Sequence, residues 1–388
     1  MPESEPPAPV RFLRSRFIHR EVVVLMILCA AALAAFLTTR VAARAAHELR
    51  VSDAATWYAR GRAHLAAGRL DEALEALGRA RALDREREEH HRSFATALVR
   101  AGQHGAARQV LLSLRQAHPE DPDINIGLAA IEAAVGAPGE AVRFYQRALF
   151  GDWAPDRIEE RERVRIEMIE YLLAGGDRAR ALAQLGLLAA DLPAGDPARG
   201  KEAARLFLEA GDPERALEIL APLIDSAPRD AAVLAMGGDA AFALGDFDVA
   251  RGYYARVPPG ETVAVMADRR ALAERVLAND PFSRRLSARA REQRLSKGHA
   301  LAAALLDACG ARLTRTPAQT EQLAALDVEI AVLGGTLARP RPPDDAAIAD
   351  GVALVAAVVT FASQHCAPLD DDARAWMLIA RRAHEGRR

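Results

Sequence analysis

The chain has 388 residues, of which 51% are apolar and 5% are aromatic. Its 51 lysines and arginines nearly balance 53 aspartates and glutamates, so the formal net charge is −2. This balance gives no electrostatic basis for nucleic-acid binding. Alanine and leucine dominate the apolar residues, which favours helices over sheets. Almost all basic residues are arginine, which we interpret as the coding bias of a GC-rich bacterial genome.

The N-terminal part combines a polar tail with one apolar segment. Residues 1–21 begin with a proline-rich stretch and are predicted to form a disordered tail. Residues 22–39 contain no charged side chain and end at Arg40. Their length is close to the lower limit for a helix that crosses a bilayer. The segment 22–39 is therefore predicted to be a single transmembrane anchor.

The charges that flank this segment predict its orientation. Four arginines precede it and three follow it, so the positive-inside rule places the N-terminus in the cytoplasm and the rest in the periplasm. A cleaved signal peptide, cut near Ala43-Arg44-Ala45, is disfavoured because the leader and the apolar stretch are both long. A lipoprotein is disfavoured because Leu28 precedes Cys29. The reversed topology, with a cytoplasmic-facing adaptor, stays open.

A periodic pattern of glycine and alanine follows the apolar segment. Six glycines are each followed five residues later by an alanine, and the intervals between these glycines are 34, 34, 40, 35 and 34 residues. This period is typical of a repeated pair of helices. The six glycines are Gly68, Gly102, Gly136, Gly176, Gly211 and Gly245.

Each repeat is predicted to be a hairpin of two amphipathic helices. Glycine is favoured after the first helix because the backbone takes a left-handed conformation there. The alanine is small because the two helices cross closely at that position. The predicted hairpins, which together form an array over 54–264, are 54–87, 88–121, 122–155, 162–195, 197–230 and 231–264.

The first hairpin carries the fullest set of repeat positions: Trp57, Gly61, Gly68, Ala73, Leu77 and Ala80. Later hairpins keep part of this set, and all six are nearly in register. The array resembles the tetratricopeptide repeat family over about 210 residues. The resemblance implies an all-α fold in which the hairpins stack into a right-handed α-solenoid, and it implies a protein-binding function.

In that family the first helices of the hairpins line a concave groove that receives a peptide or a partner helix. The resemblance implies a groove of basic and aliphatic residues, suited to an apolar or acidic segment, with Tyr58, Arg62 and Arg92 near an acidic partner. Each of these side chains, taken alone, is also consistent with simple exposure to solvent. The implied groove residues are Tyr58, Arg62, Leu65, Arg92, Thr96, Val99, Ile126, Ala130, Ile166, Glu170, Lys201, Arg205, Asp239 and Phe242.

From residue 265 the period fails although the composition stays helical. Residues 265–388 are predicted to form a capping helix followed by a helical C-terminal region. Residues 351–362 are apolar but short, so a buried core helix is predicted there and not a second span. Cys309 and Cys366 form one disulfide if this part is extracytoplasmic, or are two buried free thiols.

The sequence contains no recognisable catalytic, metal or cofactor motif, which predicts that the protein is not an enzyme. The predicted function is a scaffold that binds protein partners, contacts the bilayer through residues 22–39 and tethers a partner or assembles a complex at the bacterial inner membrane. An alternative is a substrate-recruiting subunit of an envelope enzyme with activity in the C-terminal domain. Five histidines fall within two repeats but lack the helical pairing of a metal site: His64, His90, His91, His104 and His118.

Overall fold

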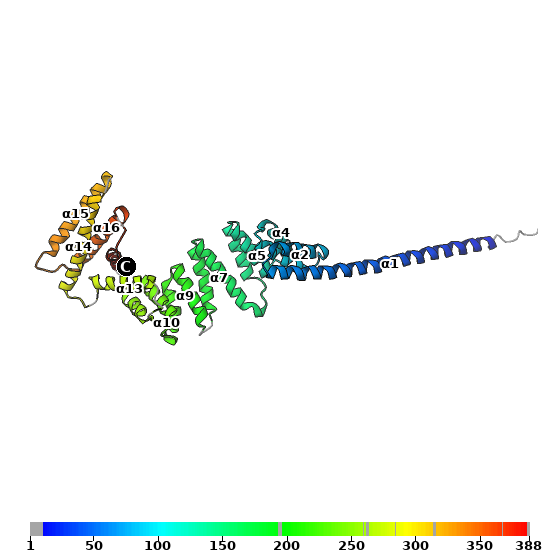
Figure 1. Ribbon diagram of the computed structural model, residues 1–388, viewed down its shortest axis with the longest axis horizontal. Helices are drawn as coiled ribbons and strands as arrows, with labels where there is room; N and C mark the ends of the chain where they lie inside the picture. The colour runs from blue at the N-terminus through cyan, green and yellow to red at the C-terminus, as the bar shows by residue number, and fades with distance from the viewer. Residues whose placement is uncertain are drawn as a thin grey trace, which may run out of the picture. The chain divides into compact units, whose positions relative to one another are not determined.

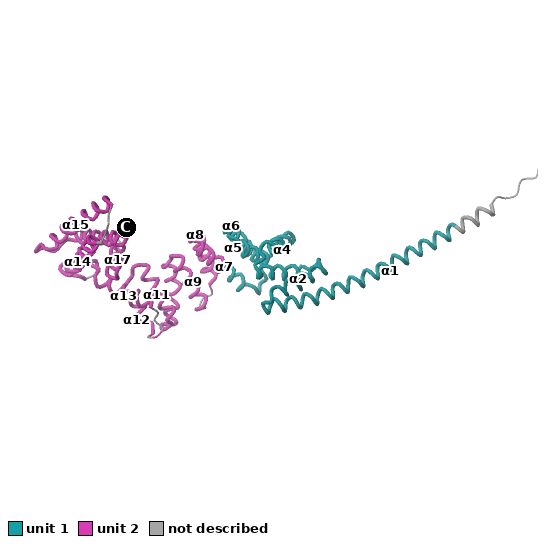
Figure 2. Tube along the Cα trace, turned by 45° about the horizontal axis from the view of Figure 1, so that its top comes forward, with its two compact units in different colours: residues 1–165 teal, residues 166–388 magenta. Residues whose placement is uncertain are grey.

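The described residues form helices joined by turns and short connections, with no strand among them. In those residues the chain forms seventeen α-helices and one short 3₁₀ helix (Figure 1). The all-α prediction is confirmed. The chain divides into two compact units, residues 1–165 and 166–388, and the division falls within one helix (Figure 2). The computed structural model describes residues 11–192, 196–258, 260, 264–283, 285–312, 316–366 and 368–385.

The first unit begins with α1, a single helix over Arg11–Ala66 (Figure 1). It joins the apolar segment to the first helix of the first hairpin without a break. Residues 11–60 contain neither glycine nor proline, so nothing in the sequence interrupts the helix. The prediction of a disordered tail over 1–21 is therefore wrong from Arg11 onward, and residues 1–10 lie outside the described part of the chain.

Three hairpins make up the rest of the first unit. Their helices pair in sequence, α1 with α2, α3 with α4 and α5 with α6, and successive hairpins pack through α2 on α3 and α4 on α5. Residues 150–157 then connect α6 to α7 (Ile158–Ala174). The elements before α7 are α2 (Leu70–Leu83), α3 (Glu88–Arg100), α4 (His104–Ala117), α5 (Pro122–Ala134), α6 (Pro138–Leu149) and the 3₁₀ helix η1 (Pro155–Arg157).

The second unit contains most of the fourth hairpin, from residue 166, and all of the fifth and sixth. Within it α9 pairs with α10 and α11 with α12, while α8 packs on α9 and α10 packs on α11. The hairpins are therefore stacked in chain order, as the repeat pattern predicts. Their helices after α7 are α8 (Arg178–Ala190), α9 (Pro197–Ala210), α10 (Pro213–Ser226), α11 (Ala231–Ala243) and α12 (Phe247–Arg256).

The repeat pattern has a direct physical cause at both of its positions. All six turn glycines have positive φ angles, for example 82° at Gly211, a conformation that costs little only without a Cβ. The Gly211 amide donates to the Leu208 carbonyl and the following amide donates to the Phe207 carbonyl, which closes the end of α9. All six alanines of the pattern are fully buried. The predicted repeat is confirmed.

Five helices follow the hairpins in the second unit. The first, α13 (Ala264–Asn279), packs against α12 on one side and against the last helix, α17, on another. The next helix, α14, packs against α15 and α16, and α16 packs against α17. These four helices are α14 (Ala288–Arg312), α15 (Pro317–Leu337), α16 (Asp345–His365) and α17 (Asp371–Glu385).

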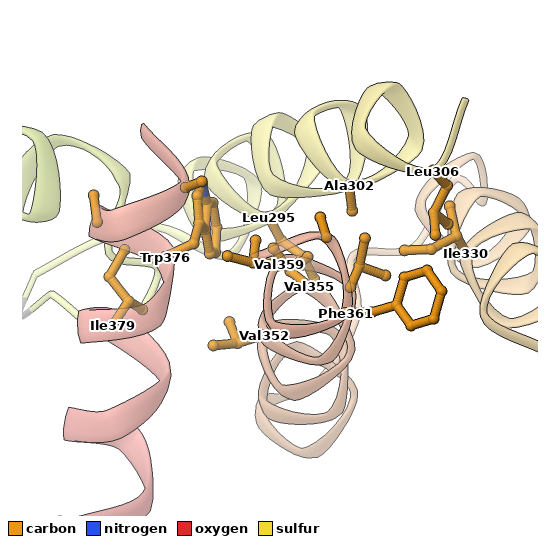
Figure 3. Close-up of a cluster of buried hydrophobic side chains, with 14 of the residues drawn as sticks. Leu295, Ala302, Leu306, Ile330, Val352, Val355, Val359, Phe361, Trp376 and Ile379 are labelled. Atoms are coloured by element: carbon orange, nitrogen blue, oxygen red, sulfur yellow. The ribbon is translucent and has the colours of Figure 1, made fainter. Parts of the chain in front are cut away.

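The C-terminal helices share one hydrophobic cluster (Figure 3). Leu295 of α14, Val355 of α16 and Trp376 of α17 meet in it, and each is at most 1% exposed. Trp376 packs directly over Gly298, where an added Cβ would lie 2.6 Å from the indole ring. Glycine at 298 therefore lets α14 and α17 approach closely. This cluster gives the last third of the chain a core of its own.

The apolar segment near residue 351 belongs to this cluster. The helix that contains it, α16, has 21 residues, longer than the predicted segment 351–362, and by length and composition it could cross a membrane. Half of its most apolar window is buried inside the protein, against 0% for the equivalent window of α1. Val352, Val355 and Val359 of α16 face its neighbours (Figure 3). The burial identifies α16 as a core helix, as predicted.

A disulfide joins Cys309 of α14 to Cys366 at the end of α16. The two Cα atoms are 5.3 Å apart, and the bond closes a segment with a sequence separation of 57 residues. Of the two alternatives open at the sequence level, the structure contains the disulfide. Cys29 lies in α1 and is an exposed free thiol.

Candidate protein-binding groove

A cavity of about 520 Å³ lies on the first unit between α3 and α5, the first helices of the second and third hairpins. These two helices are neighbours in the stack. The cavity therefore occupies the face on which the resemblance places the groove. Five of the predicted groove residues line it: Arg92, Thr96, Val99, Ile126 and Ala130.

Small residues open this cavity and aliphatic residues form its walls. Ala95 and Ala130 have short side chains. Position 127 is glycine, and a Cβ added there would lie 2.9 Å from the Leu111 Cδ1 atom. Val99 and Ile126 are half-buried walls of the cavity. An apolar hollow of this size binds apolar side chains by removing them from water.

The charged side chains at the edge of the cavity have partners within the chain. A guanidinium nitrogen of Arg92 lies 2.7 Å from the Asp121 carboxylate. Arg157 contacts the Asp123 carboxylate at 2.7 and 3.1 Å. Burial acts to raise the pKa of Asp121, but hydrogen bonds from Arg92 and from the Ile124 amide outweigh it and leave this pKa lowered. Arg92 is therefore already neutralised locally, which weakens its predicted attraction for an acidic partner.

The predicted residues of α1 lie beside this cavity and contact side chains that line it. The Tyr58 hydroxyl donates to Glu89 at 2.7 Å and lies 3.1 Å from the Ser93 hydroxyl. The Arg62 guanidinium sits 5.9 Å from the centre of the Tyr58 ring. The Leu65 carbonyl accepts a hydrogen bond from Arg100 at 3.4 Å. These contacts extend the candidate site toward α1.

In the second unit two predicted basic residues pair with acidic residues outside their own helix. Arg205 of α9 contacts Glu170 of α7 at 2.8 Å, and Lys201 contacts Asp230, the residue before α11, at 3.2 Å. Ile166 is half-buried on α7. Such solvent-exposed pairs stabilise a fold only weakly. These charges are therefore paired within the chain and are not unpaired charges directed at a ligand.

The last two predicted groove residues lie where the final hairpin meets the helices that follow. Asp239 accepts a hydrogen bond from the Tyr254 hydroxyl at 2.7 Å and pairs with Arg269 of α13 at 2.5 Å. Burial, and then the contact with Asp239, raises the pKa of Tyr254. Phe242 packs edge-on against Phe247, 5.2 Å between ring centres. The groove prediction includes both residues, but α13 and α17 cover this end of the stack.

The histidines of the first hairpins have structural contacts. His90 is 2% exposed and stacks on the Tyr58 ring at 4.9 Å, and His118 lies 2.5 Å from a Glu88 carboxylate oxygen. His64 accepts a hydrogen bond from Arg69. Across the described residues, no group of three or more histidine, cysteine or acidic side chains is placed to hold a metal ion.

The structure adds residues to the site that the sequence interpretation leaves out. Ser93 and Arg100 on α3 and Asp123 on α5 also line the cavity. Arg100 lies four residues after Thr96, and Asp123 lies three residues before Ile126, so each shares a helix face with a predicted residue. The three- and four-residue spacing from the predicted residues would therefore have identified these additional residues from the sequence.

An array of stacked helical hairpins with left-handed turn glycines and buried alanines defines an α-helical repeat protein. Two family models, each described as the tetratricopeptide repeat, match the sequence, one over residues 54–87 and the other over 92–156 and 201–261. These segments are tetratricopeptide repeats, so the chain contains a tetratricopeptide repeat array. Repeats of this family mediate protein–protein interaction, and its members are generally non-catalytic scaffolds.

Several solved structures are similar to the chain at low identity. A tetratricopeptide repeat protein from Parabacteroides merdae is 14% identical, with 63% of this chain and 92% of that one covered and a TM-score of 0.38. PilF from Pseudomonas aeruginosa is 17% identical, covering 53% and 91%, with a TM-score of 0.38. YrrB, described as having an unusual peptide-binding site, is 21% identical, covering 47% and 90%, with a TM-score of 0.34. A search of curated protein sequences gives no match.

Proposed function

We propose that this protein is a membrane-anchored scaffold that binds an apolar segment of a partner protein in the cavity between α3 and α5. The observation that carries the proposal is that cavity, because its walls are apolar while Arg92 and Asp123 at its edge are paired with charges of the same chain. Binding energy at such a site comes from burying apolar side chains of the partner, not from charge attraction.

The anchor in this proposal is the exposed apolar part of α1, residues 22–39. The most apolar window of the helix has a mean hydropathy of 2.6 and no buried residue, and side chains such as Met26 are more than 60% exposed. A lipid bilayer covers an apolar helix of this kind. Residues 40–53 continue the helix for about 21 Å, at 1.5 Å per residue, before it enters the first hairpin. The scaffold would then stand at a fixed height above the bilayer.

The membrane of the proposal is the bacterial inner membrane, with the hairpins in the periplasm. The arginines that flank residues 22–39 favour a cytoplasmic N-terminus. The disulfide between Cys309 and Cys366 supports the same orientation, because disulfides persist in the oxidising periplasm and are rare in the cytosol. Tethering restricts the partner to the membrane surface and raises its effective concentration there.

Replacing Thr96 by arginine is the mutation that tests the groove. Thr96 is exposed and lines the cavity, so a long charged side chain there blocks apolar contacts without disturbing the buried seam. We expect the amount of partner that co-purifies with tagged full-length protein from gently solubilised membranes to fall about tenfold.

The matched control is Ser113→Arg, which places the same side chain on an exposed position of α4 outside the cavity. It is expected to leave the recovered partner unchanged. Equal recovery from wild type and Thr96→Arg, with all three proteins folded by circular dichroism, contradicts binding in the groove.

A further inference from the structure

A second cavity, of about 730 Å³, lies in the second unit where the last hairpin meets the C-terminal helices. Its walls come from the start of α12, the end of α13, the turn after α13 and the end of α17. The volume is within the range of pockets that bind ligands. It shares no residue with the cavity between α3 and α5.

The cavity has an apolar floor and an apolar mouth. Phe247 and Ile379 form part of the floor and are 2% and 1% exposed; Ile379 is labelled on α17 in Figure 3. Val249 and Phe282 also line the cavity, and they remain 46% and 39% exposed. Removing this exposed valine and phenylalanine from water is favourable, so the surface beside the cavity is suited to a partner.

The turn after α13 is held rigidly by polar contacts. Asp280 is 2% exposed, and its carboxylate accepts a hydrogen bond from the Phe282 amide at 2.8 Å and contacts Arg382 at 3.5 Å. Arg294 donates to the Asp280 carbonyl at 2.7 Å and to the Ser283 hydroxyl at 3.1 Å. These bonds fix Phe282 at the mouth of the cavity, so the site is formed before any partner arrives.

The charge of the lining is negative, with three aspartates against the single Arg382. Asp280 and Arg382 contact each other, and Asp248 contacts Arg251 at 2.5 Å. Asp246 differs. It precedes α12 but makes no side-chain capping hydrogen bond, whereas Asp212 before α10 accepts one from the Arg215 amide at 3.1 Å. Among the described residues, nothing neutralises the Asp246 carboxylate at the cavity edge.

We propose that this cavity binds a second protein segment, one that carries an arginine or lysine next to a bulky apolar residue. The apolar side chain enters the hollow above Phe247 and Ile379 and covers Val249 and Phe282. The neighbouring cation contacts the carboxylate of Asp246. Charge complementarity thus selects a basic segment here, in contrast to the groove between α3 and α5, where both Asp123 and Arg92 are already paired.

The test is a selection of short random peptides displayed on phage against the full-length protein held in lipid nanodiscs. We expect enriched peptides in which arginine or lysine neighbours an aromatic or aliphatic residue. Synthetic versions of these peptides should bind Asp246→Asn about tenfold more weakly than wild type, because a charge-assisted contact is lost. Asp246 caps no amide by its side chain, so the substitution leaves the fold intact.

Two controls make the result specific. Asp212→Asn changes the same turn position of the previous hairpin, away from the cavity, and should leave peptide binding unchanged. Thr96→Arg should also leave it unchanged, so failure of the groove proposal and failure of this one are distinguishable. Enrichment of peptides without basic residues, or equal affinity for wild type and Asp246→Asn, overturns the proposal.

Discussion

Replacing Trp376 by alanine is expected to destabilise the C-terminal helices by about 3–5 kcal/mol, the range for losing a large buried aromatic side chain. Trp376 is 1% exposed and fills the space over Gly298, so little can collapse into the void. The measurement is hydrogen exchange of the α16 amides under native conditions. Their exchange should accelerate by about two to four orders of magnitude, because each 1.4 kcal/mol is a factor of ten.

The matched control is Trp57→Ala in α1. Trp57 is half-buried and lies in the first compact unit, so its loss should not change exchange in α16. If α16 exchanges equally slowly in wild type and Trp376→Ala, the cluster of Figure 3 does not stabilise the last third of the chain.

Loss of the disulfide is expected to cost a similar amount. Closing a segment with a sequence separation of 57 residues restricts the unfolded chain, which the entropy model equates to about 4 kcal/mol. Replacing both Cys309 and Cys366 by serine, or adding a reductant, should therefore accelerate exchange in α14 and α16. Cys29→Ser removes the exposed thiol of α1 and should leave their exchange unchanged.

The same bond reports on the compartment. When membranes are isolated in the presence of a thiol-alkylating reagent, Cys309 and Cys366 should react only after reduction. Free, reactive thiols at both positions in the freshly trapped protein would contradict the periplasmic orientation, and unchanged exchange after reduction would contradict the stabilising role.

The array was predictable from the sequence because its determinants are local. Gly211 needs only its own left-handed backbone, and Ala216 needs only the partner helix of the same hairpin. Both requirements recur in every hairpin, so the sequence shows the glycine and the alanine six times at a regular spacing. The continuity of α1 was readable as well, from the lack of glycine and proline over residues 11–60, although the anchor over 22–39 and the hairpin from residue 54 were predicted as separate elements.

The candidate site was predictable only where neighbouring hairpins repeat the same relation. Thr96, Val99 and Ile126 line the cavity because they lie on α3 and α5, which occupy the same position in successive hairpins. The partner of Arg92 is Asp121, a residue of the next hairpin whose position depends on how that hairpin begins. Asp239 contacts α13, a helix outside the period. No repeat pattern contains that information.

The groove itself is tested most directly by photo-crosslinking in intact cells. A photo-reactive residue at position 96 of the full-length, membrane-bound protein should give a light-dependent adduct with a partner, and a second substitution, Ala130→Arg, should abolish that adduct because both residues line one cavity. The same reactive residue at position 113 should give none. Adducts of equal yield from both positions, or an adduct at 96 that survives Ala130→Arg, would contradict a docking groove between α3 and α5.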